Sequence, residues 1–280
     1  MTDRRPRIDG HHHLWDLSTV AYDWPTVADG PIFRSFAPDD LAPELAGAEI
    51  DRTVVVQAAD SLDDTDAMIR AMAATPWIAG IVGWAPLTDT RAASIAIESR
   101  LDGGLRGIRH LIHRHPDPDW LLRADVRSGL ALLASYGLAF DVVAVYPNHL
   151  RHVPRIADEH PDLTFVIDHL AKPPIRDPGW EGWRREFEAA ARRPNVVAKL
   201  SGLDTAAGPG WTAEEIRPSV EIALEAFGPA RLLFGSDWPV CRLVSTYGEV
   251  VQATQGWLSS LGTDERDAVF GGTAERVYRL

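Results

Sequence analysis

Short apolar runs alternate with amphipathic segments along most of this chain. Runs such as 52–58 and 78–85 are rich in Val, Ile and Ala, which is typical of strands buried on both faces of a parallel sheet. The segments between them repeat apolar residues at helical spacing, for example at Trp180, Trp183 and Phe187, where core packing is the expected role. The pattern therefore predicts alternating strands and helices.

Each run gives one expected element. The expected strands are a first one that carries His11 and His13, and then residues 52–58, 78–85, 105–112, 138–145, 163–169, 195–201 and 231–237. Helices are expected over 38–50, 63–75, 90–101, 127–136, 149–159, 247–261 and 264–278, through 180–190, and after a capping box at Thr212. Residues 17–38 and 204–211 are expected to be loops, and the first is long enough to be functional or mobile.

Strands that alternate with helices in this number predict an α/β fold, the (β/α)₈ TIM barrel, as a single domain over residues 1–280. An open doubly wound sheet shares the same alternation. The chain, however, has no G-x-G-x-x-G or G-K-[ST] turn after a strand, and polar residues follow the strands from the first to the last. The barrel is therefore the favoured fold.

The composition narrows the classes of partner. The net charge of −12 repels phosphate backbones and anionic lipid surfaces, so neither nucleic acid nor a membrane is expected as a partner. The single cysteine, Cys241, excludes an internal disulfide and suits a reducing, cytoplasmic location. Residues 1–7 are short and polar, so we expect no signal peptide, and no apolar run is long enough to span a bilayer. A small-molecule substrate is the expected partner, and the sequence leaves a homo-oligomer open.

The first candidate for chemistry is the triplet His11, His12 and His13. Side chains two apart on a strand point to the same side, so His11 and His13 should converge while His12 faces the opposite layer. A remnant of a purification tag is the alternative, but three histidines are few, and the following Leu14 and Trp15 belong in a core. The spacing favours a ligand or catalytic pair.

Further polar residues lie at the carboxyl ends of the other expected strands. In a barrel these ends face one shared pocket. They are Arg109 and His110 after the fourth strand, Asp168 and His169 after the sixth, Lys199 after the seventh and Asp237 after the eighth. A single strand-end histidine or aspartate is usually a core group or a helix cap. Three histidines and one carboxylate together suit Zn²⁺ or a similar divalent ion.

Four segments in this order resemble the amidohydrolase superfamily. They are His11-x-His13, the run from Asp168 to Pro173, the run from Lys199 to Leu203, and the run from Leu233 to Cys241. More narrowly, they are similar to the sugar-lactonase branch, which includes fuconolactonase-like and rhamnonolactonase-like hydrolases and is related to 2-pyrone-4,6-dicarboxylate hydrolase. The resemblance extends to residues 271–278 and so covers nearly the whole chain.

The resemblance implies a distorted barrel that hydrolyses a cyclic ester. It implies His11, His13, His169 and Asp237 as ligands of one divalent metal ion, zinc above all, with Asp237 activating water and His169 sharing the catalytic role. The fourth strand offers no lysine for a bridging carbamate and the fifth no histidine at its tip, so the site holds at most one ion. Some related lactonases work without a metal ion, so a metal-independent enzyme is the alternative.

Opening a lactone requires a water nucleophile, a base and a positive group for the developing oxyanion. Asp237 is the expected base. The expected substrate-binding residues are Arg109, His110, Lys199, Trp24 and Trp238. His110 and Lys199 have an alternative role as ion-pair partners, and the two tryptophans as packing residues. The sequence thus predicts a hydrolase of a sugar-derived lactone, an EC 3.1.1-like lactonase. A metal-dependent decarboxylase and a catalytically silent sugar-binding barrel are the alternatives.

Overall fold

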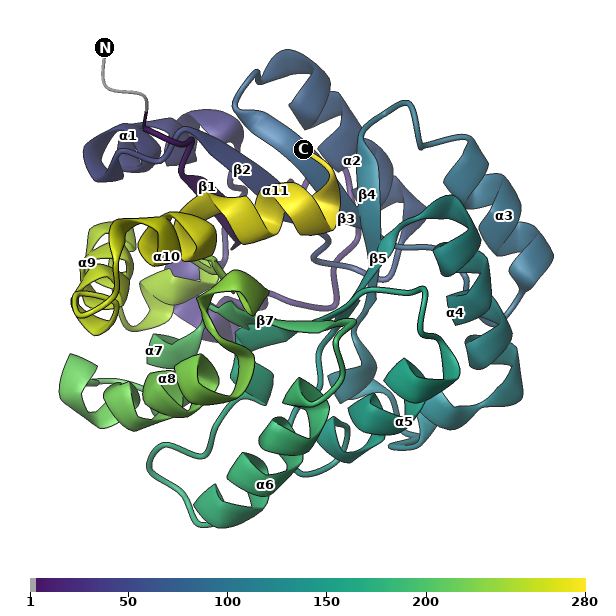
Figure 1. The fold of residues 1–280 in the computed structure, drawn as a ribbon. Helices are drawn as coiled ribbons and strands as arrows, with labels where there is room; N and C mark the ends of the chain where they lie inside the picture. The colour runs from purple at the N-terminus through teal and green to yellow at the C-terminus, as the bar shows by residue number, and fades with distance from the viewer. Residues whose placement is uncertain (1–3) are drawn as a thin grey trace.

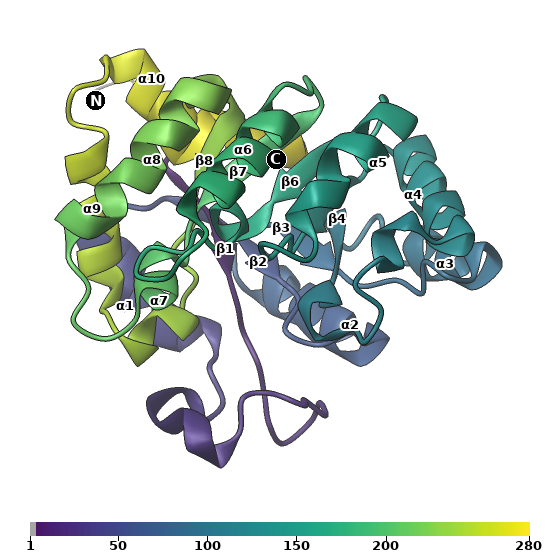
Figure 2. The same ribbon diagram turned by 90° about the horizontal axis from the view of Figure 1, so that it is seen from below.

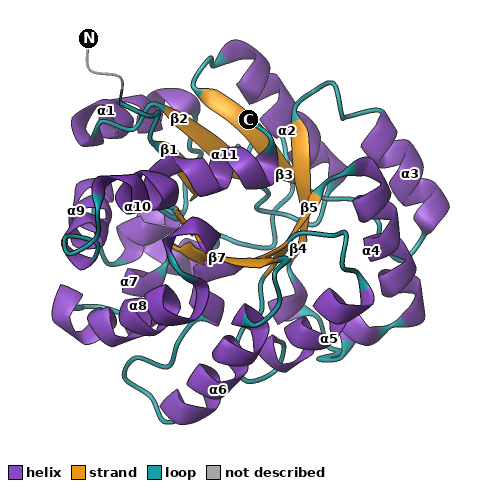
Figure 3. Ribbon diagram, in the orientation of Figure 1, coloured by secondary structure: helices purple, strands orange, loops and turns teal. Residues whose placement is uncertain are grey.

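The apolar runs form one parallel sheet that closes into a barrel, surrounded by helices (Figures 1 and 3). The computed structural model describes residues 4–280. The strands are β1 (Ile8–His12), β2 (Arg52–Val56), β3 (Ile78–Gly83), β4 (Leu105–His110), β5 (Ala139–Val142), β6 (Phe165–Ile167), β7 (Val196–Leu200) and β8 (Leu232–Phe234). Each strand pairs in parallel with the next one along the chain.

The barrel is closed by backbone hydrogen bonds just beyond β1 and β8. The N–H of Asp237 donates to the carbonyl of His11 at 2.8 Å, and the N–H of His13 donates to the carbonyl of Trp238 at 2.6 Å. These bonds join the first and last strands at their carboxyl ends. The predicted single-domain (β/α)₈ barrel is therefore confirmed.

The helices follow the predicted alternation. The α-helices are α1 (Pro38–Ala48), α2 (Leu62–Ala74), α3 (Thr90–Glu98), α4 (Ala124–Tyr136), α5 (Val153–Glu159), α6 (Trp180–Ala191), α7 (Leu203–Ala207), α8 (Ala213–Phe227), α9 (Tyr247–Trp257), α10 (Thr263–Asp267) and α11 (Thr273–Tyr278). Short 3₁₀ turns are η1 (Val27–Ile32), η2 (Ile112–Arg114), η3 (Trp120–Leu122), η4 (Leu150–His152), η5 (Asp168–Ala171), η6 (Pro229–Arg231) and η7 (Val240–Leu243), and η8 (Ala268–Gly272) is a π-helical turn.

Three predicted elements were wrong in detail. The expected loop 204–211 begins inside α7, the expected loop 17–38 contains η1, and the expected helix 264–278 is divided into α10, η8 and α11. The expected strands 138–145, 163–169 and 231–237 are shorter at their carboxyl ends than the apolar runs, because the chain there turns out of the sheet. Those turns carry the polar residues of the site.

The two ends of the barrel differ in composition. At the amino end, α11 crosses the opening (Figure 1), and Ala274, Val277 and Tyr278 pack on inward-facing strand residues such as Val54 and Val166. These residues close the amino end of the barrel, and the polar residues lie at the carboxyl end. There the long segment that follows β1 extends beyond the barrel (Figure 2) and is anchored by the Trp15 indole, which donates to the carbonyl of Arg34 at 2.6 Å.

No helix in residues 4–280 combines the length and the apolar character needed to cross a bilayer.

Candidate active site at the carboxyl end of the barrel

Four polar side chains converge at the carboxyl end of the barrel. Nε2 of His11 lies 3.3 Å from Nε2 of His13, and Oδ1 of Asp237 lies 3.6 Å from the first nitrogen and 3.4 Å from the second. The ring of His169 is centred 4.6 Å from that of His11. All four side chains are buried. The structure thus brings together the whole predicted set of catalytic and metal-binding residues.

His12 faces away from this cluster, as the strand alternation predicts. Its Nε2 lies 2.8 Å from Oγ1 of Thr53 on β2. The side chain therefore packs between the barrel and the helical layer. The two-residue spacing of His11 and His13 is what aims both rings into the barrel mouth.

The backbone at the site takes conformations that non-glycine residues rarely adopt. His169 has a φ of 54° and Asp237 a φ of 56°, and Leu170, Ala171 and Lys172 are also left-handed. Each such residue costs on the order of 1 kcal/mol or more, so this strain is balanced by the packing around it. At these turns the side chains of His169 and Asp237 come close to the ring of His11.

Gly202 allows this close approach. Its own φ is +58°, and a Cβ there would lie 2.7 Å from Nδ1 of His169 and 2.9 Å from Oδ2 of Asp237. No other residue fits that space without moving the two candidate catalytic groups.

Hydrogen bonds fix the orientation of two of the imidazoles. Nδ1 of His13 lies 2.8 Å from the carbonyl oxygen of Val56 and donates to it, so Nε2 is left with a lone pair. Nδ1 of His169 lies 2.9 Å from Oγ of Ser201. Burial, above all, lowers the pKa of His169 to about 4, so this ring is neutral at neutral pH.

Asp237 is held in its ionised form. Burial opposes ionisation, but the nearby imidazoles of His169, His13 and His11 outweigh burial and keep the pKa of Asp237 well below its usual range. A carboxylate that stays charged beside the neutral imidazole of His169 is suited to accept a proton from a bound water.

Beneath these groups lies a buried network of charges. The ammonium group of Lys199 contacts Oδ2 of Asp141 at 2.5 Å, Oδ1 of Asp168 at 3.0 Å and Nδ1 of His11 at 2.9 Å. Tyr278 donates its hydroxyl to Asp141 at 2.9 Å. Three donors of the ammonium thus meet three acceptors, and none of these side chains reaches solvent. Nε2 of His11 lies 3.3 Å from NH1 of Arg109, so cationic donors face both nitrogens of this ring.

Arg109 links this network to the pocket. NH1 of Arg109 contacts Oδ2 of Asp168 at 3.0 Å, and NH2 donates to the carbonyl of Gln57. The guanidinium is held by these two acceptors and still lines the cavity. A positive group in this position can stabilise negative charge that develops on a bound carbonyl oxygen.

The cluster opens into a cavity of about 330 Å³. Its lining includes His13, Arg109, His169 and Asp237 together with Trp24, His113, Arg114, Lys172 and Thr205. Neither Arg114 nor Lys172 forms a salt bridge within residues 4–280, so both cations are available to a ligand.

The predicted substrate-binding residues divide into three groups. Arg109 and Trp24 line the cavity. His110 lines a neighbouring hollow, because adjacent residues of β4 point in opposite directions. Lys199 and Trp238 have no exposed surface: Lys199 lies in the ionic network below, and Trp238 packs edge-on against Phe36, with 5.2 Å between ring centres. These two residues are placed to support the site, not to touch a substrate.

Several functional side chains escaped the sequence analysis. Asp141 and Tyr278 complete the buried network, Ser201 orients His169, and Lys172 and Arg114 supply cations to the cavity. The aspartate in the otherwise apolar run 138–145 was a usable signal, since a strand buried on both faces seldom carries an unpaired charge.

Three of the buried side chains are placed to hold a single metal ion. One ligand atom from each of His11, His169 and Asp237 lies within 4.8 Å of the others, and two imidazoles with a carboxylate suit zinc. The residues therefore fit one ion.

A TIM barrel that gathers histidines and an aspartate at the carboxyl ends of its strands has the architecture of the metal-competent hydrolytic barrels. The family model described as amidohydrolase, Amidohydro_2, matches residues 8–280. The chain belongs to this amidohydrolase family, which confirms the resemblance inferred from its motifs.

Two named relatives are similar over nearly their full length. The chain is 37% identical over 279 residues to an L-fucono-1,5-lactonase of Burkholderia ambifaria, covering 98% of this chain and 96% of the relative. It is 35% identical to an L-fucono-1,5-lactonase of Burkholderia multivorans at the same two coverages. A crystal structure of an amidohydrolase from Burkholderia multivorans with bound zinc superposes with a TM-score of 0.90 at 33% identity, covering 98% of this chain and 99% of that one.

Proposed function

We propose that this protein hydrolyses a small sugar-derived lactone, with Asp237 as the base that activates water. The observation that carries the proposal is the position of the Asp237 carboxylate, 3.4 Å from Nε2 of His13 at the floor of an open cavity. The relatives named L-fucono-1,5-lactonase, similar over 98% of the chain, support an aldonolactone as the substrate.

The residues suggest an order of events. A water molecule beside Asp237 gives a proton to the carboxylate as its oxygen bonds to the lactone carbonyl carbon. The carbonyl oxygen becomes negative and is stabilised by the guanidinium of Arg109. The carbonyl double bond then re-forms, the ring C–O bond breaks, and Asp237 returns its proton to the departing alkoxide, which leaves a hydroxy acid.

A divalent ion is part of the proposal. When bound by His11, His169 and Asp237, with His13 beside them, it would supply a Lewis acid for the carbonyl and lower the pKa of water. The zinc-bound relative of similar fold supports zinc as the ion. The same residues also provide a base and a cation without it, so the dependence on metal is open to experiment.

The decisive experiment is a panel of aldonolactones, assayed by acid release with and without a chelator. Hydrolysis above the spontaneous rate supports the proposal, and loss of activity on chelation with recovery on adding zinc supports the metal. If protein that carries one zinc per chain opens no lactone, a lactonase function is excluded. Release of carbon dioxide from aromatic carboxylates would then favour a decarboxylase.

A further inference from the structure

A second hollow adjoins the catalytic cavity. It has a volume of about 300 Å³ and is formed by the segments that follow β1, β2 and β4. Trp24, Ala58, Leu111 and Arg114 line both spaces and form the boundary between them. Each space alone is near the lower limit for a ligand pocket, whereas the two together suit a ligand of two linked rings.

The hollow presents two fixed hydrogen-bond acceptors. Nε2 of His110 donates to the carbonyl of Ala85 at 2.7 Å, so Nδ1 carries a lone pair. That nitrogen lies 3.9 Å from Oδ2 of Asp60, too far for a hydrogen bond between them. Asp60 is itself positioned by donors from the Gln57 amide and from the N–H of Leu111. A hydroxyl group placed at this point finds a preformed acceptor on either side.

The hollow also presents aromatic surface. The ring of Trp120 contributes to the lining, and its centre lies 4.7 Å from that of the His110 ring. Trp24 lies at the boundary between the two spaces, and the guanidinium carbon of Arg114 lies 5.7 Å from the centre of its ring. Aromatic walls with a few oriented polar groups are the combination by which proteins hold amphipathic ring ligands such as sugars.

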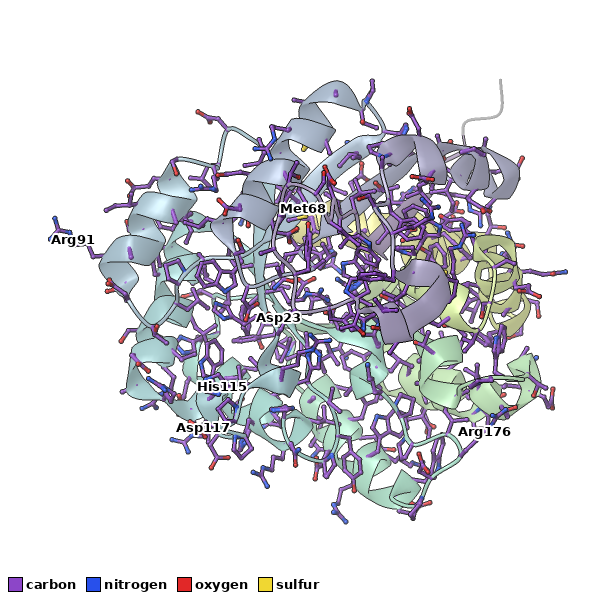
Figure 4. The ribbon with its side chains drawn as sticks, turned by 180° about the vertical axis from the view of Figure 1, so that it is seen from behind. Asp23, Met68, Arg91, His115, Asp117 and Arg176 are labelled. Carbon is purple, nitrogen blue, oxygen red and sulfur yellow. The ribbon has the colours of Figure 1, made fainter. Side chains whose placement is uncertain are left out.

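The charged side chains around the hollow are two carboxylates and one guanidinium. Asp23 and Asp60 contribute carboxylates and Arg114 a guanidinium, and His115 lies on the same face as Asp23 (Figure 4). An anionic ligand would meet two carboxylates, while a neutral polyhydroxy ligand meets acceptors and donors in similar number. The hollow is thus suited to a second sugar ring more than to a phosphate or a carboxylate.

We propose that this hollow is a second sugar subsite, so that the substrate is an aldonolactone carrying a glycosyl group. The lactone ring lies in the catalytic cavity and the glycosyl ring in the hollow, with its hydroxyls on Asp60 and His110. This inference rests on the proposed lactonase function and extends it. Arg114 and Trp24, which belong to both spaces, are then positioned to contact the bond between the two rings.

The test compares lactones in pairs. D-glucono-1,5-lactone and cellobiono-1,5-lactone form one pair, and D-galactono-1,5-lactone with a galactosyl-substituted galactonolactone forms another. In at least one pair the glycosylated lactone is expected to have the higher kcat/KM by about tenfold or more, because a filled subsite adds contacts. Hydrolysis of the single-ring lactones with no preference for either glycosylated partner would overturn the inference and leave the lactonase function intact. Hydrolysis of no lactone in these pairs or in the aldonolactone panel, by protein that carries one zinc per chain, would overturn the function itself.

Two variants locate the effect. Ala59→Phe fills the hollow and should remove the preference for the two-ring lactone while changing the single-ring kcat/KM by less than about twofold. Ala189→Phe, on α6 of the outer layer, is the matched control and should change neither value. Asp60→Asn retains the size of the side chain and should lower only the two-ring kcat/KM. If Ala59→Phe and Asp60→Asn both preserve the preference, the hollow is not the subsite.

Discussion

The two adjoining hollows at the carboxyl end of the barrel use polar residues in opposite ways. At and below the floor of the catalytic cavity the polar side chains are buried and bonded to one another, as in the set of Lys199, Asp141 and Asp168. In the neighbouring hollow, Asp23 and His115 are exposed and have few bonds. The first arrangement fixes charges for chemistry, and the second leaves groups free to bind a ligand from solution.

This difference has an energetic consequence. Buried charges must be compensated within the protein, so removing one partner of the catalytic network leaves another unpaired in a medium of low dielectric constant. Exposed groups lose little when a neighbour is removed, because water replaces it. Substitutions in the catalytic cavity should therefore change both activity and stability, and those in the hollow should change ligand preference alone.

The largest effect is expected from Asp237→Asn. The amide cannot accept the proton of water, so kcat for any lactone substrate should fall by about 10²–10⁴-fold, the usual contribution of a general base. Initial rates of acid release measure this loss, and a far-ultraviolet circular dichroism spectrum checks the fold. Asp60→Asn is the matched control in the hollow and should retain the single-ring rate. A variant at Asp237 with more than a tenth of the original kcat would mean that another group is the base.

Lys199→Met should produce the largest loss of stability. The substitution leaves Asp141 and Asp168 buried without their shared cation, and breaking a buried ion pair in this way costs about 3–5 kcal/mol of the free energy of unfolding. Urea denaturation at pH 7 measures the loss. The double variant Lys199→Met with Asp141→Asn should recover part of it, because one of the stranded carboxylates is removed. A single variant within about 1 kcal/mol of the original protein would show that water reaches the network.

Asp204→Asn should change how stability depends on pH. Burial, with a smaller effect from Asp237, raises the pKa of Asp204 to about 6, above its usual value of 3.8. Since the unfolded chain ionises first, this group lowers the free energy of unfolding as the pH rises from about 4 to about 6, with no further change above. Asparagine stays neutral and can still accept the hydrogen bond that Ser245 donates at 2.6 Å.

The expected gain at pH 8 is on the order of 1–3 kcal/mol relative to the original protein, and it should vanish near pH 4. Urea unfolding at several pH values measures it. A constant difference across this range would assign the effect to packing, not to ionisation.

The barrel itself was predictable from the sequence, because eight apolar runs buried on both faces leave few other arrangements. Asp237 and the histidines at 11, 13 and 169 were predictable for a related reason, since barrel closure brings all strand ends together. The exact ends of β6 and β8 were not. The left-handed residues from 169 to 172 contain no glycine, so nothing in the residue types marks the turn.

The depth of each residue in the barrel also could not be predicted. Lys199 points inward as strand alternation requires, but it lies one layer below the cavity, where Asp141 and Asp168 hold it. By contrast, Arg109 and His110 are adjacent on a strand and must point in opposite directions. That they line different spaces could therefore have been predicted from the sequence. The role of Trp238 could not be predicted either, because a tryptophan that lines a cavity and one that packs in the core look the same in the sequence.

The smallest effect is expected from His115→Ala in the hollow. His115 is exposed and its imidazole makes only local bonds with Asp117, so the free energy of unfolding should change by less than about 0.5 kcal/mol. The single-ring kcat/KM should also be unchanged. Urea denaturation and initial rates measure both. A loss of more than about 1 kcal/mol would mean that the hollow, like the catalytic cavity, depends on its polar groups for stability, and the contrast between the two spaces would no longer hold.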